Sequence, residues 1–121
     1  MTGKDKQPIG NWAEARAFAL SLPATELSTS YGKPAVKLNG KAFIYPGREA
    51  GNFVVASPLD EKEMLMMTDP DTFWETPHYS GWPAVLVHFD SPERDRIELV
   101  IQRAWWDRAS KAQRAEFGPR P

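Results

Sequence analysis

The stretch SYGKPAVKLNGKAFIYPG, residues 30–47, predicts a β-hairpin and with it an antiparallel sheet. Asn39-Gly40 separates two apolar-rich runs, and this dipeptide suits a type I′ turn because both central residues need positive φ angles. With a two-residue loop, the register pairs Val36 with Phe43 and predicts a buried face formed by Val36, Leu38 and Phe43. The opposite face then carries Lys37 together with Ala35, Ala42 and Ile44.

Two further strands are expected after the hairpin. Pro46-Gly47 ends the second strand, and NFVVAS at residues 52–57 supplies a third, which completes an antiparallel meander. PAVLVHF at residues 83–89 alternates, with Val85, Val87 and Phe89 on one side and Leu86 and His88 on the other. The sequence therefore predicts an antiparallel sheet of about four strands.

Helices are expected at the N-terminus and in the middle of the chain. Residues 11–23 begin with Asn11 as N-cap and place Glu14 three positions later, which is a capping-box arrangement. Residues 57–67 predict a second helix whose inward side is formed by Leu59, Met64, Leu65 and Met67. Asp69 followed by Pro70 predicts the start of a short helical turn, which Thr76-Pro77 ends.

The longest helix is expected at residues 91–110, with Ser91 and Pro92 at its start. Its buried stripe at helical spacing comprises Ile97, Val100, Ile101, Ala104 and Trp105. Ser110 followed by Gln113 predicts a capped terminal turn. The fold class is therefore α+β, with one domain at residues 11–117, a flexible segment at 1–10 and a frayed end at 118–121.

Composition excludes several kinds of site. The 121 residues contain no Cys, which excludes disulfides, thiol catalysis and Cys-based zinc sites. The two histidines match no zinc-binding spacing, and no phosphate-loop motif occurs, so we expect neither a metal nor a cofactor. The N-terminal residues lack the apolar core of a secretory signal, and no run of 18 apolar residues occurs. We therefore expect a cytoplasmic protein with no membrane segment.

Basic residues gather in two parts of the chain, although the formal net charge is −1. Residues 28–48 contain no acid and four bases: Lys33, Lys37, Lys41 and Arg48. A second positive patch is expected from Arg108, Lys111 and Arg114. A hairpin with lysines at its tip can contact the phosphates of double-stranded DNA. Alternatively, the lysines protect a sheet edge from pairing with other chains.

The stretch DPDTFWETPHYSGW, residues 69–82, is dense in acids and aromatic side chains. His78 could act as a general base beside an acid, but no activated nucleophile accompanies it, so we expect no enzyme. The same stretch can line a pocket for a small molecule or a protein, formed by Tyr31, Trp74, His78, Tyr79 and Trp82. In a purely structural interpretation, Asp69 caps a helix and His78 and Tyr79 anchor a turn.

Three motifs carry a resemblance to a known family. YGxP falls on residues 31–34, KxxGKxF on residues 37–43, and DPDxFxxTPHYxGxP on residues 69–83. With these motifs, the chain resembles the MmcQ/YjbR family. The resemblance implies a CyaY-like fold with a double-wing arrangement of antiparallel strands, and it implies DNA binding. Binding of DNA through the basic hairpin and binding of a small ligand or protein through the aromatic pocket both remain open at this stage.

Overall fold

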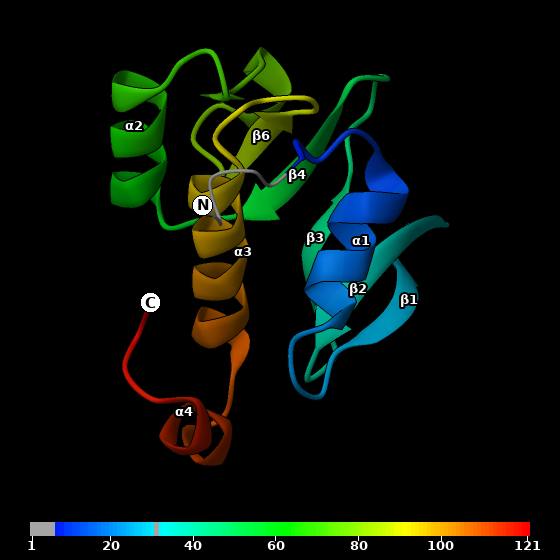
Figure 1. Ribbon diagram of the computed structural model, residues 1–121, viewed down its shortest axis with the longest axis vertical. Coiled ribbons are helices and arrows are strands. Elements are labelled where there is room, and N and C mark those ends of the chain that lie inside the picture. The colour runs from blue at the N-terminus through cyan, green and yellow to red at the C-terminus, as the bar shows by residue number, and fades with distance from the viewer. Residues whose placement is uncertain (1–6, 31) are drawn as a thin grey trace.

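The computed structural model describes residues 7–30 and 32–121, whose strands form one antiparallel sheet accompanied by helices (Figure 1). The strands are β1 (Glu26–Ser30), β2 (Lys33–Leu38), β3 (Lys41–Pro46), β4 (Asn52–Ala56), β5 (Phe73–Trp74) and β6 (Ala84–His88). Their order across the sheet is β1-β2-β3-β4-β6-β5. The helices are α1 (Trp12–Leu20), α2 (Leu59–Thr68), α3 (Arg94–Arg108) and α4 (Lys111–Phe117), with a short 3₁₀ helix η2 (Pro77–Tyr79). The predicted α+β class is confirmed, with six strands in place of about four.

The central hairpin has the predicted turn but a different register. Asn39 and Gly40 have φ angles of 54° and 81°, and Leu38 pairs with Lys41 as expected. The pairing then shifts, because Val36 lies opposite Ile44 and not opposite Phe43. An extra residue in β3 forms a bulge, which resets the alternation of side chains. Ile44, predicted on the far face, is therefore buried in the same core as Phe43.

Two strands were not predicted. β1, with the polar sequence ELSTS, pairs along its whole length with β2 and forms one edge of the sheet. The short helix expected after Asp69 is absent: Asp69 terminates α2, and a turn in which Phe73 N–H donates to Asp69 O (3.0 Å) leads into β5. Pro77 begins η2 where we expected it to end a helix. β1 is an edge strand, so one of its long edges has no neighbouring strand and is open to solvent. Its residues are exposed or half-buried, which explains why its sequence shows no alternation of apolar and polar residues.

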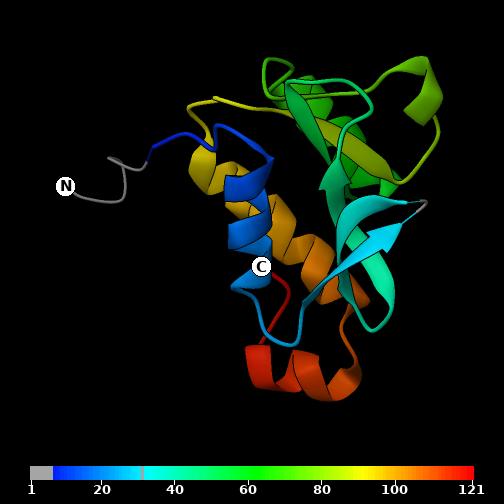
Figure 2. The ribbon, with the colours of Figure 1, turned by 90° about the vertical axis from the view of Figure 1, so that its right-hand side faces the viewer.

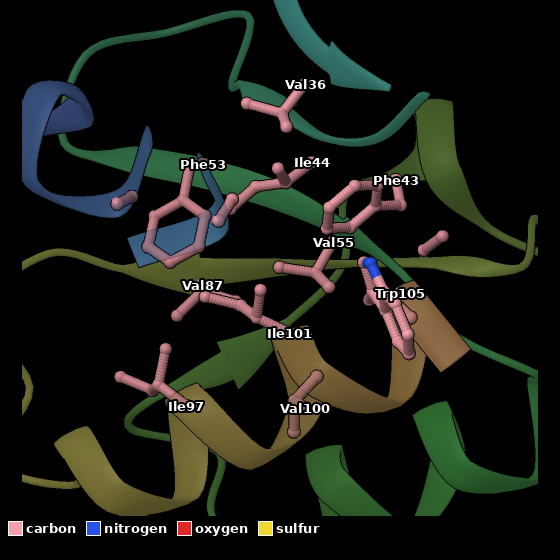
Figure 3. Close-up of a cluster of buried hydrophobic side chains, with 14 of the residues drawn as sticks. Val36, Phe43, Ile44, Phe53, Val55, Val87, Ile97, Val100, Ile101 and Trp105 are labelled. Atoms are coloured by element: carbon pink, nitrogen blue, oxygen red, sulfur yellow. The ribbon is translucent and has the colours of Figure 1, made fainter. Parts of the chain in front are cut away.

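The main core lies between the sheet and the helices α1 and α3. We call this side of the sheet the helix face (Figure 2). The stripe predicted for α3 is buried, and Figure 3 shows its side chains against those of the strands. Trp105 is fully buried, and its Nε1 donates to Pro23 O at 2.8 Å. Ile9, which precedes α1, is also buried in this core, and its carbonyl accepts from Asp90 N at 2.8 Å.

The helix starts follow the predicted caps only in part. Asn11 accepts from Glu14 N at 2.9 Å, whereas the Glu14 carboxylate accepts from Gly10 N (2.7 Å). Ser110 and Gln113 form the capping box expected for α4. The start predicted for α3 at Ser91 is wrong by three residues: α3 begins at Arg94. The Ser91 hydroxyl instead accepts from Glu93 N (3.1 Å) and lies 2.6 Å from the hydroxyl of Thr72.

Helix α2 buries a different side from the one predicted. Leu59, Met64 and Met67 are exposed, with Met67 80% exposed, whereas Leu65 and the charged Lys62 are buried. Helix α2 packs at the β5–β6 end of the sheet, where the ammonium of Lys62 finds polar partners, so a charged residue takes an inward position. The final residues lie near this helix: Arg120 pairs with Asp107 and Glu61, and Arg103 Nε donates to Pro121 O at 2.8 Å.

Candidate functional site

The side of the sheet away from α1 and α3, which we call the open face, is partly covered by residues 75–82. Tyr79 of η2 is buried there against Val54 of β4 and Leu86 of β6, with Tyr45 and Trp74 beside them. Figure 2 shows the chain around η2 on the opposite side of the sheet from α1 and α3. The sheet therefore carries a second, smaller apolar cluster, and the predicted aromatic stretch forms part of it.

A buried lysine holds this segment in place. Lys62 is 1% exposed, and its Nζ donates to Tyr79 O at 2.7 Å and to Trp82 O at 2.9 Å. It also forms an ion pair with Glu75 Oε1 at 2.7 Å. An ammonium group has three donors, so the three partners satisfy it and offset the loss of hydration on burial. Lys62 thus fixes the backbone on both sides of the Ser80-Gly81 turn.

Arg48 and His78 are in direct polar contact on this face. Nη1 of Arg48 lies 2.7 Å from Nδ1 of His78. A guanidinium can only donate, so Nδ1 accepts, and the neutral ring carries its proton on Nε2. The His78 ring lies edge-on to Tyr79, and it is near parallel to Trp82, with centroids 6.1 Å apart and planes at 22°. Arg48 therefore belongs to the same cluster as the aromatic side chains.

Two hollows flank the contact between Arg48 and His78. The first, which we call the Trp82 pocket, has a volume of about 420 Å³ and is lined by Ser30, Lys33, Tyr45, Arg48, His78, Tyr79 and Trp82. The second, the Trp74 pocket, has about 430 Å³ and is lined by Arg48, Glu49, Asn52, Trp74, Thr76, Pro77, His78, Tyr79 and Leu86. Arg48, His78 and Tyr79 line both, so they form the wall between the two hollows.

The phenol of Tyr45 contributes a neutral polar group to the Trp82 pocket. Burial of this side chain, together with the neighbouring Tyr79, raises the pKa of Tyr45 to about 12. Tyr45 is therefore uncharged at neutral pH and acts as a hydrogen-bonding and packing group.

In the Trp74 pocket, the ring of Trp74 stacks on His88, with centroids 3.5 Å apart and planes at 7°.

The structure brings most of the predicted aromatic set together. His78, Tyr79 and Trp82 line the Trp82 pocket, and Trp74 lies in the adjacent hollow. Tyr31 lies outside the described residues. Asp69, an acid of the same stretch as His78, has an Oδ2 atom that is buried without a hydrogen-bond partner.

The seven predicted basic residues are divided between different parts of the molecule. Lys33 and Arg48 line the Trp82 pocket, at the end of the hairpin opposite to its tip. Lys41 follows the tip, and the half-buried Lys37 lies in the middle of β2, beside Glu26 of β1. No local pattern indicated that two of these cations would join the aromatic set, because the contact depends on how residues 75–82 fold over the sheet.

The remaining basic residues lie near the tip of the hairpin, and two of them have structural partners. Nε of Arg108 donates to Ala42 O at 3.3 Å, and Asn39 Nδ2 donates to Arg108 O at 2.9 Å and to Gln113 Oε1 at 3.0 Å. Arg114 lies 4.1 Å above the ring of Trp106 and donates to Trp106 O. Lys111, at the start of α4, is exposed. The tip of the hairpin is therefore attached to the α3–α4 junction.

Residues 7–30 and 32–121 hold neither a metal-binding cluster nor a membrane-spanning helix. These residues contain no group of three or more His, Asp or Glu side chains placed to hold a metal ion. In the same part of the chain, no helix has the length and apolar character needed to cross a membrane.

Comparisons with known proteins agree with the fold. This chain is 33% identical over 86 residues to the uncharacterised proteins Rv2570 of Mycobacterium tuberculosis and Mb2600 of Mycobacterium bovis, covering 68% of this chain and 67% of each relative. It is also similar to the crystal structure of Deinococcus radiodurans protein DR2400, which has a DUF419 domain. That match has a TM-score of 0.70 at 13% identity and covers 91% of this chain and 89% of the other. The model of the YjbR family matches residues 20–106, which include the hairpin and the aromatic stretch, and the chain therefore belongs to the YjbR family.

Proposed function

We propose that this protein is a binding module whose Trp82 pocket takes a small organic molecule with an aromatic or apolar body. The observation that carries this proposal is the position of Trp82. Its side chain is 56% exposed, yet Lys62 holds its backbone carbonyl and the His78 ring lies near parallel to it. An exposed indole on a fixed backbone is a ready surface for stacking, because little conformational entropy is lost when a ligand binds.

The surroundings of Trp82 suit such a ligand. The pocket combines aromatic walls from Tyr45, Tyr79 and His78 with a few polar groups at its rim, which is the usual composition of small-molecule sites. The sheet contributes Ser30 of β1, Lys33 of β2 and Tyr45 of β3 to its lining, and the chain around η2, which supplies His78 and Tyr79, lies on the open face (Figure 2). The strands and the turn held by Lys62 give the pocket a rigid support, which favours specific binding over non-specific hydrophobic adsorption.

A thermal-shift screen with aromatic and heteroaromatic fragments tests this proposal. Fragments that bind should raise the Tm of the wild type, since a ligand of the folded state stabilises it. Trp82→Ala should abolish these shifts, while its own stability changes by no more than about 0.5 kcal/mol because the side chain is largely exposed. Met67→Ala removes another exposed apolar side chain from α2 and serves as the matched control, which should retain every shift. A screen without shifts, or shifts that persist in Trp82→Ala, would contradict the proposal.

Binding of double-stranded DNA is a second candidate, and one observation favours it. The hydrogen bonds of Asn39 join the tip of the hairpin to α4, so that Lys41 and Lys111 lie at the same end of the molecule. Two exposed lysines there could contact neighbouring phosphates. In this case, Lys37→Ala combined with Lys41→Ala should weaken binding to a labelled duplex, and affinity should fall steeply as salt rises. Absence of measurable duplex binding at low salt would eliminate this candidate.

A further inference from the structure

We infer that the ligand of the Trp82 pocket is an acid, whose carboxylate or phosphate group is bound by Lys33 and Arg48 while its aromatic or apolar body packs on Trp82. This inference rests on the proposed function and adds the chemical class of the ligand. The cations of the hairpin were predicted to bind DNA, and the aromatic side chains of residues 75–82 were predicted to line a ligand pocket. In the Trp82 pocket, residues of both groups would bind the same ligand.

The charges around the pocket support an anionic ligand. Among the described residues that line it, Lys33 and Arg48 are the two charged ones, and none is a carboxylate. The neighbouring Trp74 pocket differs, because Glu49 lines it together with Arg48. Tyr45 adds no negative charge at neutral pH. An anion is therefore favoured on the Trp82 side of the Arg48–His78 wall.

The partner of Arg48 is a histidine ring and not a carboxylate. Arg94, Arg103 and Arg120 each pair with a carboxylate. Among the described residues, Arg48 has no such partner, and the group it contacts is a neutral imidazole. One N–H of its guanidinium points to His78, which leaves four donors and an uncompensated positive charge. A planar guanidinium of this kind can bind a carboxylate or phosphate through two parallel hydrogen bonds.

The contact with His78 also positions the guanidinium. His78 is held within a short 3₁₀ helix that Lys62 clamps, and the ring of His78 lies beside that of Trp82. The cation and the stacking surface are therefore linked through one side chain, and a single ligand can reach both. Lys33, at the start of β2, also lines the pocket and supplies a second cation.

A matched pair of probes tests the inference, namely 2-naphthoate and 2-naphthamide. The two have nearly the same shape, and they differ in that the first carries a negative charge. We expect 2-naphthoate to bind about tenfold more tightly, which corresponds to one charge-assisted interaction. The Kd of each probe is measured by isothermal titration calorimetry, and the preference should shrink as ionic strength rises.

Variants locate the source of the preference. Arg48→Gln keeps a donor for His78 but removes the charge, and Lys33→Gln removes the other cation. Each variant should raise the Kd of 2-naphthoate several-fold and leave the Kd of 2-naphthamide unchanged. Lys37→Gln is the control, because Lys37 lies on the same strand and has the same charge but is not among the residues lining the pocket. It should change neither Kd.

The outcomes separate this inference from the proposed function. If both probes bind with equal Kd and Trp82→Ala abolishes binding of both, the pocket is a ligand site but its ligand is not selected by charge, and the inference is wrong. If neither probe binds, the inference and the proposed function fail together. If Lys37→Gln weakens 2-naphthoate as much as Arg48→Gln does, a diffuse positive field is responsible, and the assignment to Arg48 and Lys33 is overturned.

Discussion

At the scale of single residues, Lys62 determines whether the Trp82 pocket exists. Its ammonium bonds two backbone carbonyls that lie three residues apart, at Tyr79 and Trp82, and thereby shapes the turn between them. Glu75 completes the set of partners and is partly exposed. A buried cation with three partners stabilises a particular backbone path, because any other path leaves the charge without hydrogen bonds.

Replacing this lysine should destabilise the protein and damage the pocket. Lys62→Met keeps the length of the side chain but leaves the carbonyls of Tyr79 and Trp82 without a donor, so we expect a loss of about 2–4 kcal/mol in the free energy of unfolding. Urea unfolding measures this loss. Glu63→Ala, one position along the same helix and exposed, should change stability by about 0.5 kcal/mol or less. A Lys62→Met variant as stable as the wild type would show that the carbonyls find other partners.

At the scale of secondary-structure elements, the hairpin β2–β3 is anchored at its tip. Asn39 has a positive φ angle that suits the turn, and its side-chain amide also contacts Arg108 and Gln113. Asn39 therefore has two roles, in the backbone conformation of the turn and in the contacts to α3 and α4. Substitution by glycine separates them, because glycine tolerates the same backbone angles but has no side chain. The tip of the hairpin is therefore attached to the α3–α4 junction, at the end of the molecule where Lys41 follows the turn.

The variant Asn39→Gly tests this anchor. It preserves the turn and removes the hydrogen bonds to Arg108 O and Gln113 Oε1, so stability should fall by about 1 kcal/mol. Amide hydrogen exchange at residues 39–42 should become faster, since the tip can then open locally. Unchanged exchange at these residues would mean that the contacts of Asn39 do not hold the tip in place.

Elements with a strong local signal were predictable from the sequence. The turn at Asn39-Gly40, the buried stripe of α3 and the capping box of α4 depend on residues close together in the chain, and each was confirmed. The bulge in β3 was not predictable, because the choice between Phe43 and Ile44 as partner of Val36 depends on how α1 and α3 pack on the sheet.

The candidate site was only partly predictable for a similar reason. Its aromatic residues stood out in one stretch, but Lys62 did not, since lysines are rarely buried. One signal was available: Lys62, Leu65 and Met66 fall at helical spacing, and the structure places them on the inward side of α2. Leu59, Met64 and Met67 are apolar but exposed. A prediction based on hydrophobicity alone therefore assigned the wrong side of α2 to the core.

At the scale of the whole molecule, the two faces of one sheet are used differently. The helices α1 and α3 cover the helix face, and side chains of α3 and the strands are buried together in the main core (Figure 3). The open face is covered by a short clamped segment, which leaves two hollows divided by Arg48 and His78. The large core supports the sheet, and the sheet in turn supports a small binding surface.

The most direct test of this account is a chemical-shift map of the isotope-labelled protein with a saturating fragment that raises its Tm. The account predicts the largest shifts at the indole N–H of Trp82 and at the backbone amides of Ser30, Lys33 and His78, with small shifts at the tip of the hairpin. Largest shifts at Lys41 and Lys111, or shifts confined to the exposed side of α2, would contradict the assignment of the Trp82 pocket as the binding site.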